Sequence, residues 1–308
     1  MSPLRQAVAD YLTLRRALGY KLEEHEPLLN EFVDDLEQVG ASTVTIEAAL
    51  ACAMKPQGVQ PYRWKQRLTV IRGFARYLHS MDPASQVPPS DLLAYRRRRP
   101  TPYLFCEEEI AGLVAAAGAL AHPLRAATHR SLFGLLAATG MRGGEALRLD
   151  RGDIDLDAGT LDINKTKYNK SRRLPLHPST VAALEDYVRE RDRWLPVAAQ
   201  PSFFVNTTGT RLQARRVREL FTKLIDQLGL EPRNGSGRPT AHDLRHSFAV
   251  STLLEWYRTD VDVAARMPLL SAYLGHISPT STYWYLQAVP ELLALAASRL
   301  EHPTGGRR

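Results

Sequence analysis

The segment 82–102 divides this 308-residue chain into two blocks with different sequence patterns. It has prolines on both sides of a run of four arginines, Arg96–Arg99. Because a residue before proline is kept out of the helical conformation, this composition predicts an extended linker rather than a helix. The length of the chain suits two domains. We therefore expect a first domain over 1–95, a basic linker over 96–103 and a second domain over 104–308.

The first block consists of helical patterns separated by glycine or proline. Apolar residues recur at helical spacing in four runs, near 4–18, 26–39, 44–53 and 61–80. The fourth run carries Arg63, Lys65 and Arg67 beside an apolar seam, which suits a helix lying against DNA phosphates. A solvated charged helix surface gives the same pattern, and the sequence leaves both interpretations open.

The four linker arginines, Arg96, Arg97, Arg98 and Arg99, could each meet a backbone phosphate. A disordered basic spacer would have a similar composition, but the position between two helical blocks favours DNA. The net charge of +7 and the pI near 9.5 also favour a polyanionic partner. The first block and linker together are therefore interpreted as a helical DNA-binding domain with a basic tail.

The second block mixes longer helical patterns with short strand-like runs. Three runs of strand length, with turns between them, predict a small antiparallel sheet near 154–156, 160–163 and 173–176. A further strand-like run lies at 203–205. Helices are expected from 107 onward and near 122–139, 178–193, 213–228, 241–256, 262–274 and 290–301. The predicted fold class is mainly α with a small antiparallel β-sheet.

Two cysteines, Cys52 and Cys106, lie far apart and match no metal-ligand pair, which indicates reduced thiols. The amino terminus leads into a charged amphipathic stretch instead of an apolar signal region. No run of apolar residues reaches the length of a membrane span. We therefore expect a cytoplasmic protein without membrane contact.

The most specific pattern is the segment 241–249, AHDLRHSFA, followed by Leu-Gly-His at 274–276 and by Tyr285. An arginine stays charged and donates in a planar fork, so it suits the negative charge that builds on a phosphate under attack. A phenol can make that attack if neighbouring groups assist it. Each arginine or histidine alone would be expected at the surface or in the core. In combination they favour a phosphoryl-transfer site.

Together with Arg142 in the run TGMRGGEAL at 139–147, these residues resemble the signature of the tyrosine recombinases, the phage-integrase family. The resemblance covers roughly residues 104–287 and implies a two-domain clamp around DNA. It is closer to recombinases of transposons and other mobile elements than to the Xer resolvases. The catalytic residues that it implies are Arg142, Lys167, His242, Arg245, His276 and Tyr285.

The resemblance also implies the role of each residue. Tyr285 would attack the scissile phosphate and form a 3′-phosphotyrosine, while Arg142 and Arg245, aided by the two histidines, would bind the phosphate oxygens. His242 would also help to manage the proton of the nucleophile. Lys167 would protonate the departing 5′ oxygen. No ATP, metal or other cofactor is expected, because the covalent intermediate retains the bond energy. The implied partners are double-stranded DNA and a homo-tetramer on paired sites, with companion recombinases allowed.

Neighbouring residues compete for some of these positions. The resemblance selects Lys167 over Lys165 and Lys170, and Lys170 is then expected on the DNA backbone. Family spacing from His276 selects Tyr285 over Tyr283, which lies nearly opposite on a helix and is expected to pack with Trp284. His246, directly after Arg245, is expected to point elsewhere and to serve in packing or in support of the site.

Several alternatives stay open on the sequence alone. His242 and His246 have the spacing of helical zinc ligands, but Arg245 between them would repel a cation. A type IB topoisomerase shares the chemistry, and a catalytically silent DNA-binding regulator could share the fold. Gly143 and Gly144 depart from the family pattern and cost helix propensity, which would loosen the support of Arg142. The last helix could dock on a neighbouring subunit or on its own domain.

Overall fold

The computed structural model describes residues 2–20, 22, 24–93, 101–164, 171–196, 200–259, 261–276, 278 and 280–301. Lys167, Lys170 and Arg96–Arg99, which the sequence singled out, lie outside these described residues. The chain divides into two compact units, residues 1–99 and 100–308.

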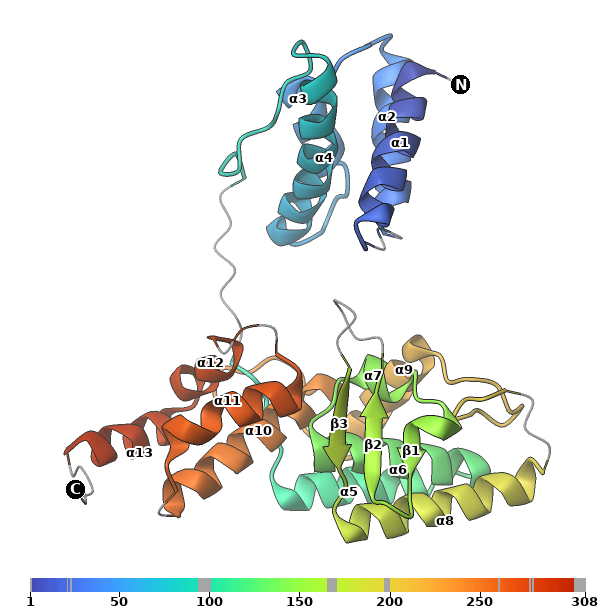
Figure 1. Cartoon of the computed structure of the whole chain (residues 1–308), viewed down its shortest axis with the longest axis vertical. Helices are drawn as coiled ribbons and strands as arrows, with labels where there is room; N and C mark the ends of the chain where they lie inside the picture. Colours follow the sequence, from blue (N-terminus) through green and yellow to red (C-terminus); the bar gives the residue numbers. More distant parts are fainter. Residues whose placement is uncertain are drawn as a thin grey trace. The chain divides into compact units, whose positions relative to one another are not determined.

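The first unit contains four described helices, shown in blue and teal in Figure 1: α1 (Pro3–Ala17), α2 (His25–Gln38), α3 (Ile46–Met54) and α4 (Pro61–Met81). α1 and α4 begin with a proline, whose missing N–H costs nothing in the first turn. Each helix turns an apolar face inward, and Phe32, Ile71 and Phe74 are fully buried between them. This shared core makes the unit a helical bundle.

In the second unit, helices surround a small sheet. The helices are α5 (Glu107–Gly118), α6 (Pro123–Thr139), α7 (Gly143–Ala146), α8 (Pro178–Trp194), α9 (Ala214–Gln227), α10 (Ala241–Arg258), α11 (Val263–Leu274), α12 (Thr280–Ala288) and α13 (Pro290–Glu301), with a 3-10 turn at Arg151–Asp153. The strands are β1 (Ile154–Asp155), β2 (Thr160–Ile163) and β3 (Arg172–Pro175).

The sheet is antiparallel in the order β1-β2-β3. Leu161 in the central strand lies opposite Ile154 on one side and Leu174 on the other, and all three are buried. The predicted fold class, mainly α with a small antiparallel sheet, is confirmed. The run 203–205 differs from the expected strand, because Val205 makes just an isolated bridge, with Arg211.

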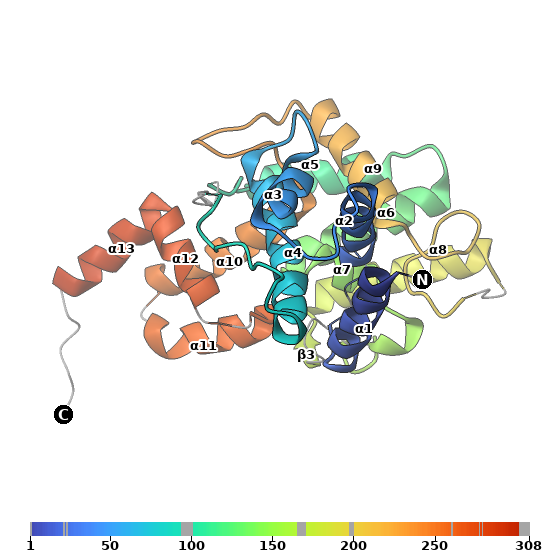
Figure 2. The same cartoon turned by 90° about the horizontal axis from the view of Figure 1, so that it is seen from above.

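Two apolar clusters support the second unit. One lies around α5, α6, α8, α9 and the sheet, and the other joins α10 to α11, α12 and α13. In both views α13 and α8 lie at opposite ends of the unit, and the sheet lies between them (Figures 1 and 2). α10 packs on α6 as well as on α11–α13. It therefore connects the two clusters and carries the 241–249 motif between them.

The last helix packs on its own domain through one face. Leu292 is fully buried against the α10–α12 cluster, and Arg258 of α10 pairs with Glu291 at 2.7 Å. Leu293, on another face of α13, is exposed. Within the described part of the chain, none of the helices is long and apolar enough to cross a membrane.

Candidate active site

Arg245 is buried at the junction of three helices. It lies in the second turn of α10, which starts with a capping box between Thr240 and Asp243. Its guanidinium donates to the carbonyls of Gly140, at the end of α6, and Leu274, at the end of α11, at 2.8 and 2.7 Å. These are helix-end carbonyls without a partner inside their own helices. Burial, helped by nearby Arg142, lowers the pKa of Arg245 to about 10, so it stays charged at neutral pH.

Three arginines bind three consecutive carbonyls at the end of α11. Arg172 Nε donates to Tyr273 O at 2.8 Å, Arg245 donates to Leu274 O, and Arg142 Nη2 donates to Gly275 O at 2.7 Å. The carboxyl end of a helix carries partial negative charge, which favours cations there. Arginines from the α6–α7 junction, from β3 and from α10 thus meet at the turn before His276.

Glu145 connects two of these arginines. Its buried carboxylate accepts from Arg142 Nη1 at 2.9 Å and from Arg172 Nη2 at 2.7 Å. Burial by itself would raise the pKa of Glu145, but the bonds from Arg172 and Arg142 outweigh it and hold the pKa below its usual value. The carboxylate is therefore charged and fixes both guanidiniums. The Arg142 side chain is still 38 % exposed, which leaves it able to meet a ligand.

His276 follows this turn directly. Its Nδ1 lies 2.7 Å from Thr282 Oγ1 of α12, and its backbone N–H donates to Ser271 O at 2.9 Å. Burial, together with the charges of Arg245 and Arg142, lowers the pKa of His276 to about 3. The imidazole is neutral at pH 7, so it can donate one hydrogen bond without adding charge beside the arginines.

Tyr285 projects inward from α12 and is 2 % exposed. Its ring stacks on His276, with 6.4 Å between ring centroids, and its hydroxyl lies 3.0 Å from Nδ1 of His246. Tyr283 on the same helix is 45 % exposed, so the expectation that it packs is wrong, whereas Trp284 does pack against this cluster. The two tyrosines point to different sides because they lie two residues apart on a helix.

His246 departs from the sequence expectation. It was expected to point away from the site, but one helical turn brings it beside His242, with 4.7 Å between ring centroids, and its ring reaches Tyr285. His242 is exposed, yet desolvation by surrounding protein atoms and the charge of Arg245 hold the pKa of His242 below its usual value. Both histidines therefore lie on the side of α10 that faces the site.

The described members of the expected catalytic set are thus brought together: Arg142, His242, Arg245, His276 and Tyr285. Sequence reasoning missed Glu145, Arg172 and Thr282. A capping-box position three residues after Arg142 could have indicated Glu145. No local pattern marks Arg172, because its partner Tyr273 lies 101 residues away and is brought near by the tertiary fold. Thr282 was missed because the sequence analysis did not predict that α12 begins at Thr280.

The expected DNA-contacting residues of α4 differ in their environments. Arg63 is exposed and Lys65 is half-buried. Arg67 is 21 % exposed and bonds within its own unit, to Glu31 at 2.9 Å and to Cys52 O at 3.0 Å. These bonds give Arg67 a role in holding the bundle together.

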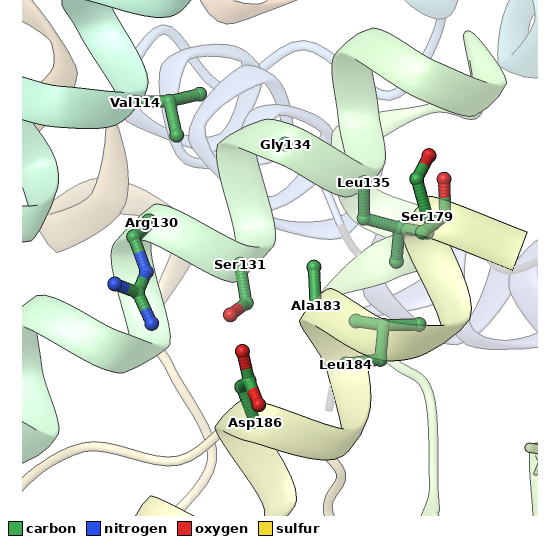
Figure 3. Close-up of a pocket in the computed structure, with 10 residues that line it drawn as sticks. Val114, Arg130, Ser131, Gly134, Leu135, Ser179, Ala183, Leu184 and Asp186 are labelled. Carbon is green, nitrogen blue, oxygen red and sulfur yellow. The ribbon is translucent and has the colours of Figure 1, made fainter.

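A pocket of about 260 Å³ lies elsewhere, between α5, α6 and α8. Figure 3 shows Val114, Leu135 and Leu184 on its walls and Asp186 pointing toward Ser131. Of the expected catalytic set, the members that the structure describes do not line it. Among the described residues, no group of three or more His, Cys, Asp or Glu side chains is placed to hold a metal ion.

The depressed pKa of His276 predicts a pH dependence of stability. The pKa of His276 is about 3 in the folded protein and 6.5 in the unfolded chain. Below pH 6.5 the unfolded chain therefore binds a proton on this imidazole that the folded protein does not bind. The stabilisation is complete above pH 6.5 and is lost as the pH falls toward 3. Urea unfolding of wild type between pH 7 and 4 should therefore show a steeper loss than unfolding of His276→Gln. An equal dependence of the free energy of unfolding on pH in the two proteins would contradict the lowered pKa of His276.

The glycines around Arg142 predict opposite effects on stability. Gly140 has φ +58°, and an added Cβ would lie 2.5 Å from the Phe248 ring, so Gly140→Ala should lower the free energy of unfolding by about 2–4 kcal/mol. Gly143 has open space for a Cβ and no positive φ, so Gly143→Ala should raise it by about 0.4–1 kcal/mol. Thermal or urea unfolding of both variants measures the difference; destabilisation by Gly143→Ala would contradict it.

The mainly helical domain brings together two arginines, two histidines and a tyrosine, a combination of side chains that suits the transfer of a phosphodiester. The model of the phage integrase family matches residues 105–291. The chain is 43 % identical to y4rB, a candidate integrase/recombinase of Sinorhizobium fredii, over 98 % of both chains. It is 29 % identical to the tyrosine recombinase XerD of Caulobacter vibrioides, over 100 % of this chain and 95 % of that protein. The chain belongs to the phage integrase family, the family of the tyrosine site-specific recombinases.

Solved structures show the same fold. The integrase of transposon Tn1549 in complex with transposon right-end DNA aligns with a TM-score of 0.67 and 15 % identity, over 97 % of this chain and 99 % of that one. The XerH recombinase bound to a palindromic difH substrate aligns with a TM-score of 0.65 and 21 % identity, over 90 % of this chain and 79 % of that one.

Proposed function

We propose that this protein is a site-specific DNA recombinase that cuts and rejoins DNA through a 3′-phosphotyrosine on Tyr285. One observation carries the proposal: three arginines bind consecutive carbonyls before His276, and Tyr285 stacks on that histidine. Positive charge and a potential nucleophile thus meet in one place. Membership in the phage integrase family supports the same conclusion.

In the proposed reaction, Tyr285 attacks the scissile phosphate of double-stranded DNA. Arg142 and Arg245 bind the non-bridging oxygens, and His242 and neutral His276 donate further hydrogen bonds. Lys167 protonates the departing 5′ oxygen. The 5′ hydroxyl of a partner strand then attacks the phosphotyrosine and restores the phosphodiester. Because the covalent bond is exchanged and not hydrolysed, the cycle needs no ATP.

The rest of the chain is assigned to DNA binding and assembly. Residues 1–95 form the DNA-binding domain, and Arg63, Lys65, Arg96–Arg99 and Lys170 contact backbone phosphates. Four protomers assemble on two paired sites, alone or with companion recombinases, in the cytoplasm. The fold shared with the Tn1549 transposon integrase supports a role in moving a mobile element.

Covalent trapping tests the proposal. Nicked duplexes from the ends of the DNA that flanks the gene are incubated with the protein, and denaturing gels are scanned for protein–DNA adducts. We expect an adduct on the 3′ side of the cleaved strand, followed by strand exchange between two labelled sites. Relaxation of supercoils without exchange would instead indicate a topoisomerase, and tight, salt-sensitive binding without any adduct would indicate a silent regulator.

A further inference from the structure

His246 contacts the atom that the proposed reaction makes reactive. Its Nδ1 lies 3.0 Å from the Tyr285 hydroxyl oxygen, and the two rings meet edge to face with 5.5 Å between centroids. A hydrogen bond of this length is within the range needed for proton transfer. The contact joins α10 to α12, which lie 39 residues apart at these positions.

The helix geometry separates His246 from its neighbour Arg245. Arg245 points to the ends of α6 and α11, whereas His246 points to α12 and packs on Trp284, with 5.6 Å between ring centroids. α10 therefore presents a phosphate-binding cation and a tyrosine-binding imidazole at adjacent positions. One turn earlier, His242 lies edge to face with His246.

We propose that His246 is a further catalytic residue, the base that takes the phenolic proton of Tyr285. This inference rests on the proposed function. The family resemblance assigns the nucleophile's proton to His242, but the described contact to the Tyr285 hydroxyl comes from His246. His242 is exposed and remains a donor to the phosphate.

The Tyr285 oxygen forms its bond to phosphorus while the bond from phosphorus to the 5′ oxygen breaks, and the phenolic proton passes to Nδ1 of His246. The 5′ oxygen takes its proton from a separate acid. On rejoining, the bond from phosphorus to Tyr285 breaks, and the imidazolium returns its proton to the phenolic oxygen. This requires Nδ1 to be unprotonated before attack.

Two titratable side chains face the His246 ring among the described contacts: His242 on α10 and Tyr285 on α12. Arg245 is adjacent in sequence, but its guanidinium is held by the carbonyls of Gly140 and Leu274. An imidazole nitrogen 3.0 Å from the phenolic oxygen can take the proton as the bond to phosphorus forms, so attack does not require a free phenolate beforehand.

The test measures single-turnover adduct formation on a duplex with a 5′-bridging sulfur at the scissile phosphate. A sulfur leaving group needs no proton, so this substrate restores the rate of a variant that lacks the acid for the leaving group. The rate of a variant that is impaired in activating the nucleophile stays low. We expect His246→Gln to lower the rate about 100-fold or more on both the sulfur and the oxygen substrates. Its rate should rise about tenfold per pH unit up to pH 9, while that of wild type levels off above neutral pH.

A second variant distinguishes the loss of a base from a folding defect. In His246→Ala, added imidazole should restore adduct formation in a saturable way, which a damaged fold would not allow. A His246→Gln enzyme with the wild-type rate overturns the proposal, and so does an equal loss with an unchanged pH profile, which indicates positioning alone. Absence of an adduct from wild type would overturn the proposed function itself, and this proposal with it.

Discussion

Tyr285→Phe is expected to abolish the covalent protein–DNA adduct and to leave DNA binding intact. The substitution removes one oxygen, the nucleophile of the proposed reaction, and keeps the ring that stacks on His276. The bond to His246 is lost, which should cost about 0.5–1.5 kcal/mol of stability. Denaturing gels on nicked substrate measure the adduct, and gel shifts measure binding.

The same helix supplies the control. Tyr283→Phe makes an identical chemical change two residues away, on a side chain that is 45 % exposed. It should form the adduct at the wild-type rate. A persistent adduct in Tyr285→Phe that disappears in Tyr283→Phe would move the nucleophile to Tyr283.

Arg245→Ala is expected to slow adduct formation about 100- to 1,000-fold, the usual loss for one donor to a developing oxyanion. It also leaves the buried carbonyls of Gly140 and Leu274 without this donor, which should lower the free energy of unfolding by about 1–3 kcal/mol. Single-turnover kinetics below the unfolding temperature separates the two effects.

Two variants sharpen this prediction. Arg245→Lys keeps the charge but cannot bind both carbonyls and a phosphate in a planar fork, so it should recover a small part of the rate. Arg258→Ala removes an exposed arginine at the other end of α10, where it pairs with Glu291, and should leave the rate unchanged. An Arg245→Ala enzyme with the wild-type rate would exclude Arg245 from phosphate binding.

Local patterns were sufficient for most of the helices. Apolar residues at helical spacing marked α1, α4, α6 and α11 within one or two residues of their observed ends. The run 203–205 was different. Its Phe203 and Phe204 are buried against Tyr187, so core packing, rather than strand pairing, explains their apolar side chains.

The exposed face of α4 shows why charge alone was ambiguous. Arg67 looked equivalent to Arg63 in sequence, but in the bundle it reaches Glu31 and the Cys52 carbonyl. Its partners lie 36 and 15 residues away. Whether a basic side chain binds its own domain or is available to DNA depends on such distant contacts.

The sequence by itself determined the chemical inventory: the arginines, the histidines and the tyrosine at family spacing, and the helices that carry most of them. The tertiary structure decided how these groups act on one another. Arg142, Arg172 and Arg245 share consecutive carbonyls because α6, β3 and α10 converge on the end of α11. His246 reaches Tyr285 for the same kind of reason, since α12 packs against α10. Helical spacing determines on which side of its helix a residue lies. Which residue it contacts there depends on how a second helix packs against that side.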